Sequence, residues 1–219
     1  MNASTGPVVD AAFLRRWLDV ATAAVDRESG RLTELDSPIG DADHGSNMRR
    51  GFLAARTAVE QEPPDTPGGV LVTVGRTLIS TVGGASGPLY GTLLRRAGKA
   101  LGDEPAVGAD QLGDALRAGV DGVVQLGGAA AGDKTMLDAL LPALDALTGA
   151  LDAGGSAAEV FGAAAHAADD GAKATIPLRA RKGRASYLGE RSIGHQDPGA
   201  TSAALLLTAL ADTARETAA

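Results

Sequence analysis

The chain has 219 residues, of which 44% are hydrophobic and only 3% aromatic, and it carries a formal charge of −7 with no cysteine. This length suits one domain with a single core, so we expect residues 1–219 to form one unit. The lack of cysteine excludes disulfides, thiolate metal sites and a cysteine nucleophile, and the acidic balance argues against nucleic acid or an anionic membrane as a partner.

Apolar residues that recur every three or four positions predict helices along most of the chain. No stretch alternates with the period of two that is typical of a strand, so the predicted fold class is all-α. The last helix is apolar on most faces and is expected to be the most buried. The predicted helices are 8–28, 46–60, 70–81, 88–101, 110–126, 134–151, 157–175 and 199–215.

Local signals set the expected ends of these helices. The first helix is expected to end near Gly30, and Asp110 to cap the fifth. Residues 176–198 predict a long segment without helix. The first seven residues lack the basic start and apolar core of a signal peptide, and the longest apolar run, 203–207, is too short to span a membrane. These features favour a cytoplasmic protein.

Three carboxylates, those of Asp36, Asp41 and Asp43, fall within eight residues of a predicted loop. Two carboxylates about 4 Å apart repel by roughly 4 kcal/mol at an effective dielectric near 20, so their convergence calls for a counter-charge. Mg²⁺ bound through carboxylates and phosphate oxygens is one solution. Alternatively, each aspartate forms a turn or caps a helix. An EF-hand is excluded, because Ser46 and Phe52 stand where that motif needs glycine and glutamate.

Two glycine-rich stretches separate predicted helices. Residues 83–87 offer backbone N–H groups and the Ser86 hydroxyl to a phosphate, or they simply make a tight turn. Residues 127–135 nearly match a P-loop, but Asp133 is inserted between glycine and lysine and the stretch follows a helix, which excludes that motif. Residues 133–135 are expected to cap the sixth helix.

A basic segment precedes the last helix. Arginine pairs bidentately with phosphate, so this segment is a candidate phosphate contact, although a solvated loop is the alternative. Asp197 is placed to cap the last helix, and His195 suits either a structural hydrogen bond or a catalytic role. Five of the chain's 20 Lys and Arg residues lie in this segment, namely Arg179, Arg181, Lys182, Arg184 and Arg191.

Taken together, four blocks of the chain closely resemble the ADP-binding L subunits of bacterial phosphoenolpyruvate-dependent dihydroxyacetone kinases. The blocks are residues 35–48, 82–92, 132–136 and 180–202. They occur in the order of the family and span nearly the whole chain, and the last block is the most specific. The resemblance implies a single-domain eight-helix antiparallel barrel with a nucleotide site at one end.

The resemblance also implies site residues. Asp36, Asp41 and Asp43 would hold two Mg²⁺ ions that bridge the nucleotide phosphates, and Arg184 would neutralise charge during phosphoryl transfer. The assignments of Ser46 and of Gly127 rest on the most variable parts of the pattern. The residues implied to contact ADP are His44, Gly45, Ser46, Asn47, Ala85, Ser86, Gly127, Met136, Arg184, Asp197, Pro198 and Gly199.

For function, the resemblance implies a phosphoryl relay. ADP stays bound as a cofactor, receives a phosphoryl group from a phosphohistidine of the M subunit, and passes it to dihydroxyacetone held by the K subunit. Two alternatives remain open: one half of an ATP-dependent kinase that exchanges its nucleotide, or a nucleotide-dependent regulatory partner of a transcription factor. A homodimer is also compatible with the sequence.

Overall fold

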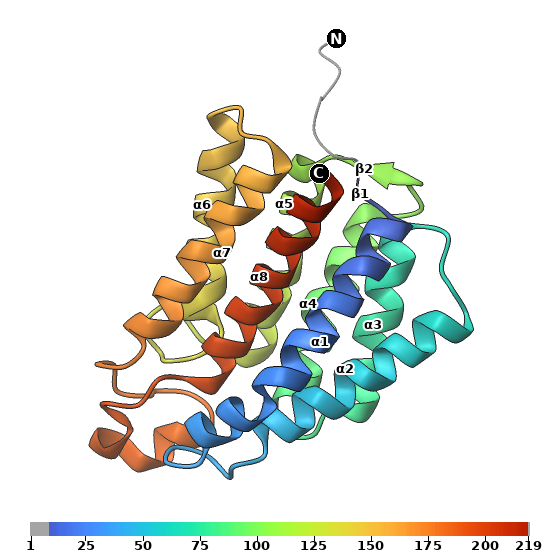
Figure 1. The fold of residues 1–219 in the computed structure, drawn as a ribbon. Coiled ribbons are helices and arrows are strands. Elements are labelled where there is room, and N and C mark those ends of the chain that lie inside the picture. Colours follow the sequence, from blue (N-terminus) through green and yellow to red (C-terminus); the bar gives the residue numbers. More distant parts are fainter. Residues whose placement is uncertain (1–8, 219) are drawn as a thin grey trace.

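Helices account for nearly all the regular structure in a computed structural model, which describes residues 9–218 (Figure 1). The all-α prediction is confirmed, although the expected helix start at Val8 lies outside the described residues. The elements are β1 (Val9–Asp10), α1 (Ala11–Asp36), α2 (His44–Gln61), α3 (Pro67–Thr81), α4 (Ser86–Leu101), β2 (Ala106–Val107), α5 (Ala109–Gly127), α6 (Leu137–Asp152), α7 (Ala157–Ala174), the 3-10 helix η1 (Arg184–Ser192) and α8 (Pro198–Ala218).

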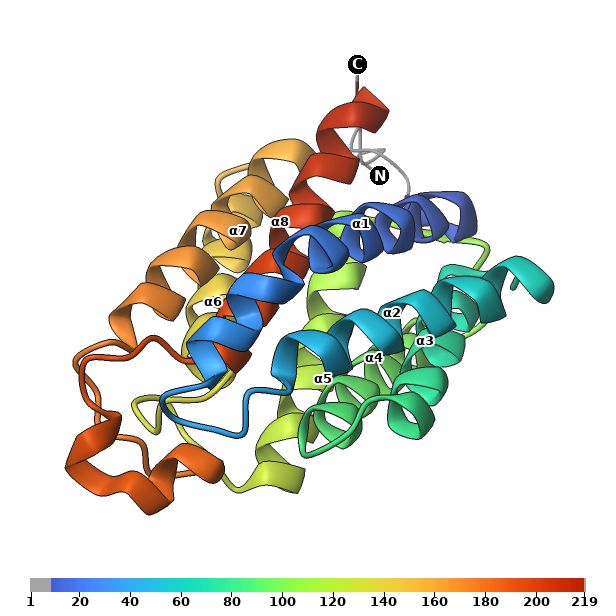
Figure 2. The same cartoon turned by 60° about the horizontal axis from the view of Figure 1, so that its bottom comes forward.

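The eight α-helices form a closed ring. Each helix packs against the next one in sequence, and α8 packs against α1 to complete the circle. Because successive helices run in opposite directions, the loops that follow α1, α3, α5 and α7 all lie at one end (Figures 1 and 2). Residues from four distant parts of the chain therefore meet at that end.

The opposite end carries a feature that the sequence did not predict. Two-residue strands β1 and β2 pair antiparallel there, with Val9 opposite Val107 and Asp10 opposite Ala106. The Asp10 carboxylate also accepts a hydrogen bond of 2.7 Å from the Phe13 N–H and so caps α1. This short sheet joins the start of α1 to the loop before α5.

Helix α1 runs to Asp36, so its predicted end near Gly30 was wrong. A glycine inside a helix costs only about 1 kcal/mol relative to alanine. Leu32, two residues further on, is completely buried, and burial of a leucine side chain contributes about 1.5–3 kcal/mol. Packing therefore outweighs the weak stop signal, and the helix delivers Asp36 to the end of the ring.

Two other predicted boundaries differ from the structure. Gly108, not Asp110, is the N-cap of α5, and the side chain of Gln111 accepts the Gly108 N–H at 3.0 Å. Residues 176–198 contain η1, which a period of 3.6 residues could not reveal because 3-10 helices have about three residues per turn. Between Pro198 and Ala214 of α8, only Thr208 is exposed, in line with its expected burial.

The ring is filled by aliphatic side chains with a few aromatic ones, and Phe52 of α2 is among those with no exposed surface. We expect Phe52→Ala to lower the free energy of unfolding by about 3–5 kcal/mol, because it removes a large buried side chain and leaves a cavity. Urea denaturation measures this loss. Tyr187→Ala is the control, since Tyr187 is 88% exposed and its replacement should change stability by less than about 0.5 kcal/mol. Equal effects would contradict the placement of Phe52.

Within residues 9–218, no helix combines the length and apolar character needed to cross a membrane.

Candidate functional site

The loops at one end of the ring enclose a cavity of about 800 Å³. Its lining comes from the end of α1, the starts of α2, α4 and α8, the loop before α6, and η1 with the residues just before it. Most of the residues that the sequence singled out meet here. The residues predicted to contact metal or nucleotide that line the cavity are Asp36, Asp41, Asp43, His44, Ala85, Ser86, Met136, Arg184, Asp197, Pro198 and Gly199. Lys134, Thr135, Arg181 and Lys182 line it as well.

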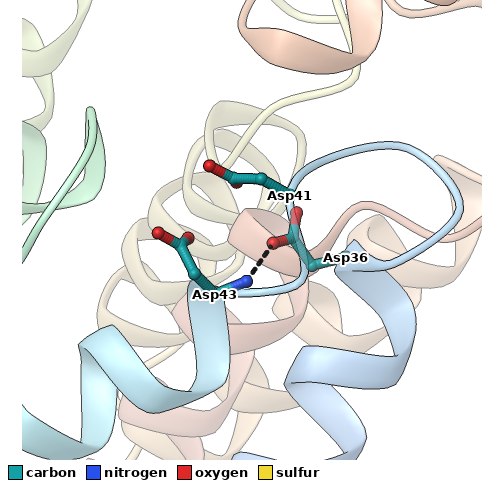
Figure 3. Close-up of side chains that lie close together, drawn as sticks. All are labelled: Asp36, Asp41 and Asp43. Carbon is teal, nitrogen blue, oxygen red and sulfur yellow. Dashed lines mark hydrogen bonds between the residues drawn. The ribbon is translucent and has the colours of Figure 1, made fainter.

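The three predicted carboxylates form one cluster at this cavity (Figure 3). Asp36 is the last residue of α1, Asp41 lies in the following loop and Asp43 immediately precedes α2. One oxygen from each lies within 4.8 Å of the others. Carboxylate oxygens are the ligands that Mg²⁺ prefers, so this donor set fits a hard divalent cation.

The cluster is built around Asp36, which is buried. Its Oδ2 accepts hydrogen bonds from the backbone N–H groups of Asp43 at 3.0 Å and His44 at 3.2 Å. A Cβ atom on residue 40 would collide with the Asp36 carboxylate, so Gly40 permits the close approach. Asp36 thus supports the loop and also faces the cavity.

Asp43 behaves differently, although it occupies the N-cap position of α2. Its side chain makes no capping hydrogen bond, so the simple capping role does not apply to it. The preceding Ala42 has φ +59°, a left-handed conformation that is uncommon for a residue with a side chain. Such backbone strain is typical of functional loops, and here the strained residue lies between Asp41 and Asp43, whose carboxylates converge with that of Asp36.

Arg184 opens η1 and places its guanidinium beside this cluster. Its Nη2 lies 2.8 Å from Oδ2 of Asp41, and both side chains are well exposed, at 64% and 41%. An exposed pair of this kind contributes little to stability. The guanidinium can therefore leave Asp41 at little cost. It also lines the cavity, where it can contact an anion.

His44 lies at the centre of a buried hydrogen-bond network. Its Nδ1 is 3.2 Å from Oγ of Ser86, and its Nε2 is 2.9 Å from Oγ of Ser202. The Tyr90 hydroxyl lies 2.7 Å from the same Ser202 oxygen. Burial lowers the pKa of His44, against the opposing effect of the Asp36 and Asp43 carboxylates. A neutral imidazole can then connect the two serines.

Sequence reasoning missed Tyr90 and Ser202. Burial raises the pKa of Tyr90, so this hydroxyl stays protonated. Both lie in blocks that carry the family resemblance, and Ser202 follows Pro198 by about one helical turn, as Tyr90 follows Ser86. Such spacing places a residue on a face but does not show what that face contacts.

Asp197 caps α8, as predicted, because its Oδ2 accepts the Ala200 N–H at 2.7 Å. Burial raises the pKa of Asp197 to about 7, although the Ala200 N–H acts in the opposite direction. The carboxylate of Asp138 raises this pKa further, while the ammonium of Lys134 lowers it.

This pKa predicts a pH dependence of stability. Between pH 4 and 7 the folded protein retains a proton on Asp197 that the unfolded chain, with a pKa of 3.8, has released. Stability from this group therefore falls as the pH rises through that window. In EDTA, we expect the free energy of unfolding of the wild type to fall by about 3 kcal/mol between pH 4 and 7 because of this group, and Asp197→Asn to lack that fall. Urea denaturation at pH 4 and 7 measures both. Asp65→Asn is an exposed control, and identical pH profiles for all three proteins would contradict the assignment.

A smaller apolar pocket of about 260 Å³ adjoins the main cavity. Gly127 does not line the main cavity but lies in this pocket together with Val123, Leu137 and Leu89. Met136 is shared by both spaces. The two spaces thus share part of their lining, and the smaller one is mainly apolar.

Three predicted residues in the first turn of α2 lie outside the lining of both spaces. Gly45 is buried against α1, where a Cβ atom would meet the Ser29 carbonyl. Ser46 is exposed and donates to the carbonyl of Asp43 at 2.9 Å. Asn47 is buried and accepts a hydrogen bond from Arg50. The structure thus does not bring these three residues to the cavity.

The family of the chain follows from comparison with known proteins. A family model described as the DAK2 domain matches residues 38–212. The chain belongs to the DAK2 domain family. This DAK2 protein is 44% identical over 200 residues to the ADP-binding subunit DhaL of PEP-dependent dihydroxyacetone kinase from Escherichia coli (strain K12), covering 91% of this chain and 95% of that relative.

Other DAK2 relatives differ in length. The ADP-binding subunit DhaL of PEP-dependent dihydroxyacetone kinase 1 from Listeria innocua is 41% identical and covers 93% of this chain and 97% of its own. A D-erythrulose kinase from Mycolicibacterium smegmatis is 38% identical over 92% of this chain, which spans only 35% of that enzyme. The resemblance found in the four sequence blocks is confirmed.

Solved structures agree with the DAK2 assignment. The dihydroxyacetone kinase of C. freundii in its native form superposes with a TM-score of 0.71 at 27% identity, over 97% of this chain and 37% of that one. The same kinase in complex with AMP-PNP and Mg²⁺ gives a TM-score of 0.71 at 25% identity, over 97% and 36%. The DAK2 chain therefore spans just over a third of each solved chain.

Proposed function

We propose that this protein is the nucleotide-binding phosphoryl-transfer subunit of a dihydroxyacetone kinase, with residues 1–219 forming one domain. The observation that carries the proposal is the convergence of three carboxylates, a glycine-rich helix start and an arginine on one cavity. Similarity to relatives named as ADP-binding subunits, over 95% and 97% of their lengths, supports ADP as the nucleotide.

The metal assignment rests on the chemistry of the donor set. Asp36, Asp41 and Asp43 would hold two Mg²⁺ ions, which fit these carboxylate oxygens and, when bound, would neutralise phosphate charge as Lewis acids. Without a cation, three close carboxylates repel one another. The related C. freundii kinase structure with AMP-PNP and Mg²⁺ supports this combination of ligands.

The remaining residues would position the nucleotide. Ser86 and the free N–H groups at the start of α4 suit phosphate oxygens. The apolar pocket with Gly127 and Met136 suits the adenine base. Arg184 can exchange its contact with Asp41 for a bidentate contact to phosphate. The chain supplies position and charge, which are the main requirements of phosphoryl transfer.

We further propose the relay reaction rather than a self-contained kinase cycle. The phosphohistidine of an M subunit would donate a phosphoryl group to ADP retained here, and dihydroxyacetone held by a K subunit would receive it to give dihydroxyacetone phosphate. This chain spans 95% and 97% of relatives named as PEP-dependent ADP-binding subunits, but only 35% of the D-erythrulose kinase. Similarity to the C. freundii kinase solved with AMP-PNP, an ATP analogue, keeps an ATP-dependent kinase half as the second candidate.

The nucleotide that remains after exhaustive dialysis distinguishes these functions. Mass spectrometry and phosphorus NMR of the denatured protein would identify it. Near-stoichiometric ADP is the expected result and supports a retained cofactor. An empty protein that binds and exchanges ATP freely would favour the ATP-dependent kinase half.

A further inference from the structure

Lys134, which the sequence suggested as a helix cap, instead buries its charged end in the protein. It lies in the loop between α5 and α6, and 1% of its surface is exposed. Its three Nζ–H groups lie within hydrogen-bond distance of four backbone carbonyls. Within residues 9–218, Nζ forms no ion pair with a carboxylate within 4.0 Å. The carbonyls belong to Ser192 at 2.7 Å, Thr175 at 2.9 Å, Leu178 at 3.0 Å and Ile176 at 3.4 Å.

These four carbonyls all come from residues 175–192, the segment between α7 and α8 that carries Arg184. Other hydrogen bonds draw its two ends together. The Gly194 N–H donates to the Ile176 carbonyl at 2.8 Å, and the Ala180 N–H donates to Oγ of Ser192 at 2.9 Å. The ammonium of Lys134 therefore occupies the centre of a closed loop.

The backbone of Lys134 adopts a conformation that is unfavourable for a residue with a side chain. Its φ is +65°, a left-handed conformation in which glycine is the favoured residue. Only Ala42 of the carboxylate loop shares this property among the non-glycine residues described. Strained residues persist where the surrounding structure holds them. Burial also lowers the pKa of Lys134, which marks the cost of placing its charge there.

We infer that Lys134 is a positioning residue, whose caged ammonium fixes residues 175–192 so that Arg184 is presented to the carboxylate cluster. Both loop ends are bound to one cation, and Arg184 lies between them, 2.8 Å from Asp41. A further hydrogen bond of 3.0 Å joins the Arg181 N–H to the carbonyl of Asp133, next to Lys134. The part that concerns nucleotide binding rests on the function proposed above.

Lys134→Gly tests the inference, because glycine accepts the φ of +65° and the substitution removes the whole side chain with its ammonium. Without nucleotide, we expect trypsin to cleave between Arg179 and Arg191 at least about 10-fold faster than in the wild type, with unchanged helical circular dichroism. Lys173→Met is the control, since Lys173 is exposed at the end of α7. Wild-type resistance to trypsin in Lys134→Gly would overturn the inference. If that variant does not fold, Lys134→Met, which keeps the length of the arm, is measured instead.

Chemical rescue separates the ammonium from general packing. n-Butylammonium should restore trypsin resistance to Lys134→Gly, because it replaces the lost arm and its N–H donors. Tetramethylammonium should not, since it has charge but no N–H group. Equal rescue by both ions, or by neither, would overturn the caged-ammonium assignment.

Binding of Mg-ADP, measured by calorimetry, tests the effect on Arg184. We expect Lys134→Gly to weaken binding at least about 10-fold, and to add no further loss in an Arg184→Ala background. Full additivity, or faster cleavage with unchanged affinity, would overturn the positioning role. Failure of the wild type to bind Mg-ADP would refute the proposed function alone, because the trypsin assay uses no nucleotide.

Discussion

Asp43→Ala should weaken Mg²⁺-dependent ADP binding by more than about 100-fold while the helical content stays unchanged. Loss of a supporting group around a metal site typically costs 10–100-fold, and a direct ligand should cost at least the upper end of that range. The Asp43 side chain makes no capping bond, so its removal should leave α2 intact. Calorimetry with and without Mg²⁺, together with circular dichroism, measures both quantities.

Asp41→Ala should weaken Mg²⁺-dependent binding as well, although it also removes the partner of Arg184. Asp114→Ala is the matched control, because Asp114 is an exposed aspartate of α5 that does not line the cavity. Full ADP retention by both Asp41→Ala and Asp43→Ala would rule out the metal assignment.

Arg184→Ala should slow the formation of dihydroxyacetone phosphate by about 10³-fold or more. An arginine that stabilises charge on a transferring phosphoryl group contributes about 10³–10⁵-fold to the rate. Its loss should leave stability nearly unchanged, because the ion pair with Asp41 is exposed. The rate is measured with the K and M partner proteins and phosphoenolpyruvate as the phosphoryl source.

Arg179→Ala serves as the control for this rate. Arg179 lies in the same basic segment but pairs with Glu190 at 3.1 Å and does not line the cavity. Arg184→Lys should recover only part of the rate, since lysine cannot form a bidentate contact. Equal rates for Arg184→Ala and Arg179→Ala would contradict the role of Arg184.

The helices were predictable because each buries one face, so its apolar residues repeat with the helical period. The carboxylate cluster was predictable too. Asp36, Asp41 and Asp43 are close in sequence, so they need a counter-charge wherever their loop lies in the fold. The end of α1 was not, because the glycine signal at Gly30 is local whereas the burial of Leu32 depends on the neighbouring helices.

The partners of buried polar groups were the least predictable part of the site. Lys134 appeared to be a cap because its four carbonyl partners lie more than 40 residues further along the chain. His44 was placed at the site by resemblance, but its contact with Ser202 spans 158 residues. The sequence shows which residues are polar, but their hydrogen-bond partners depend on the fold.

Closure of the ring has a consequence for how this protein folds. Packing between consecutive helices involves short loops, whereas the joint between α1 and α8 connects the two ends of the described chain. Loop-closure entropy opposes that contact more than any other in the ring. The chain's single tryptophan, Trp17, lies at the joint and donates to the Leu206 carbonyl at 3.1 Å. Its fluorescence should therefore report the folding step in which α8 packs against α1 and closes the ring.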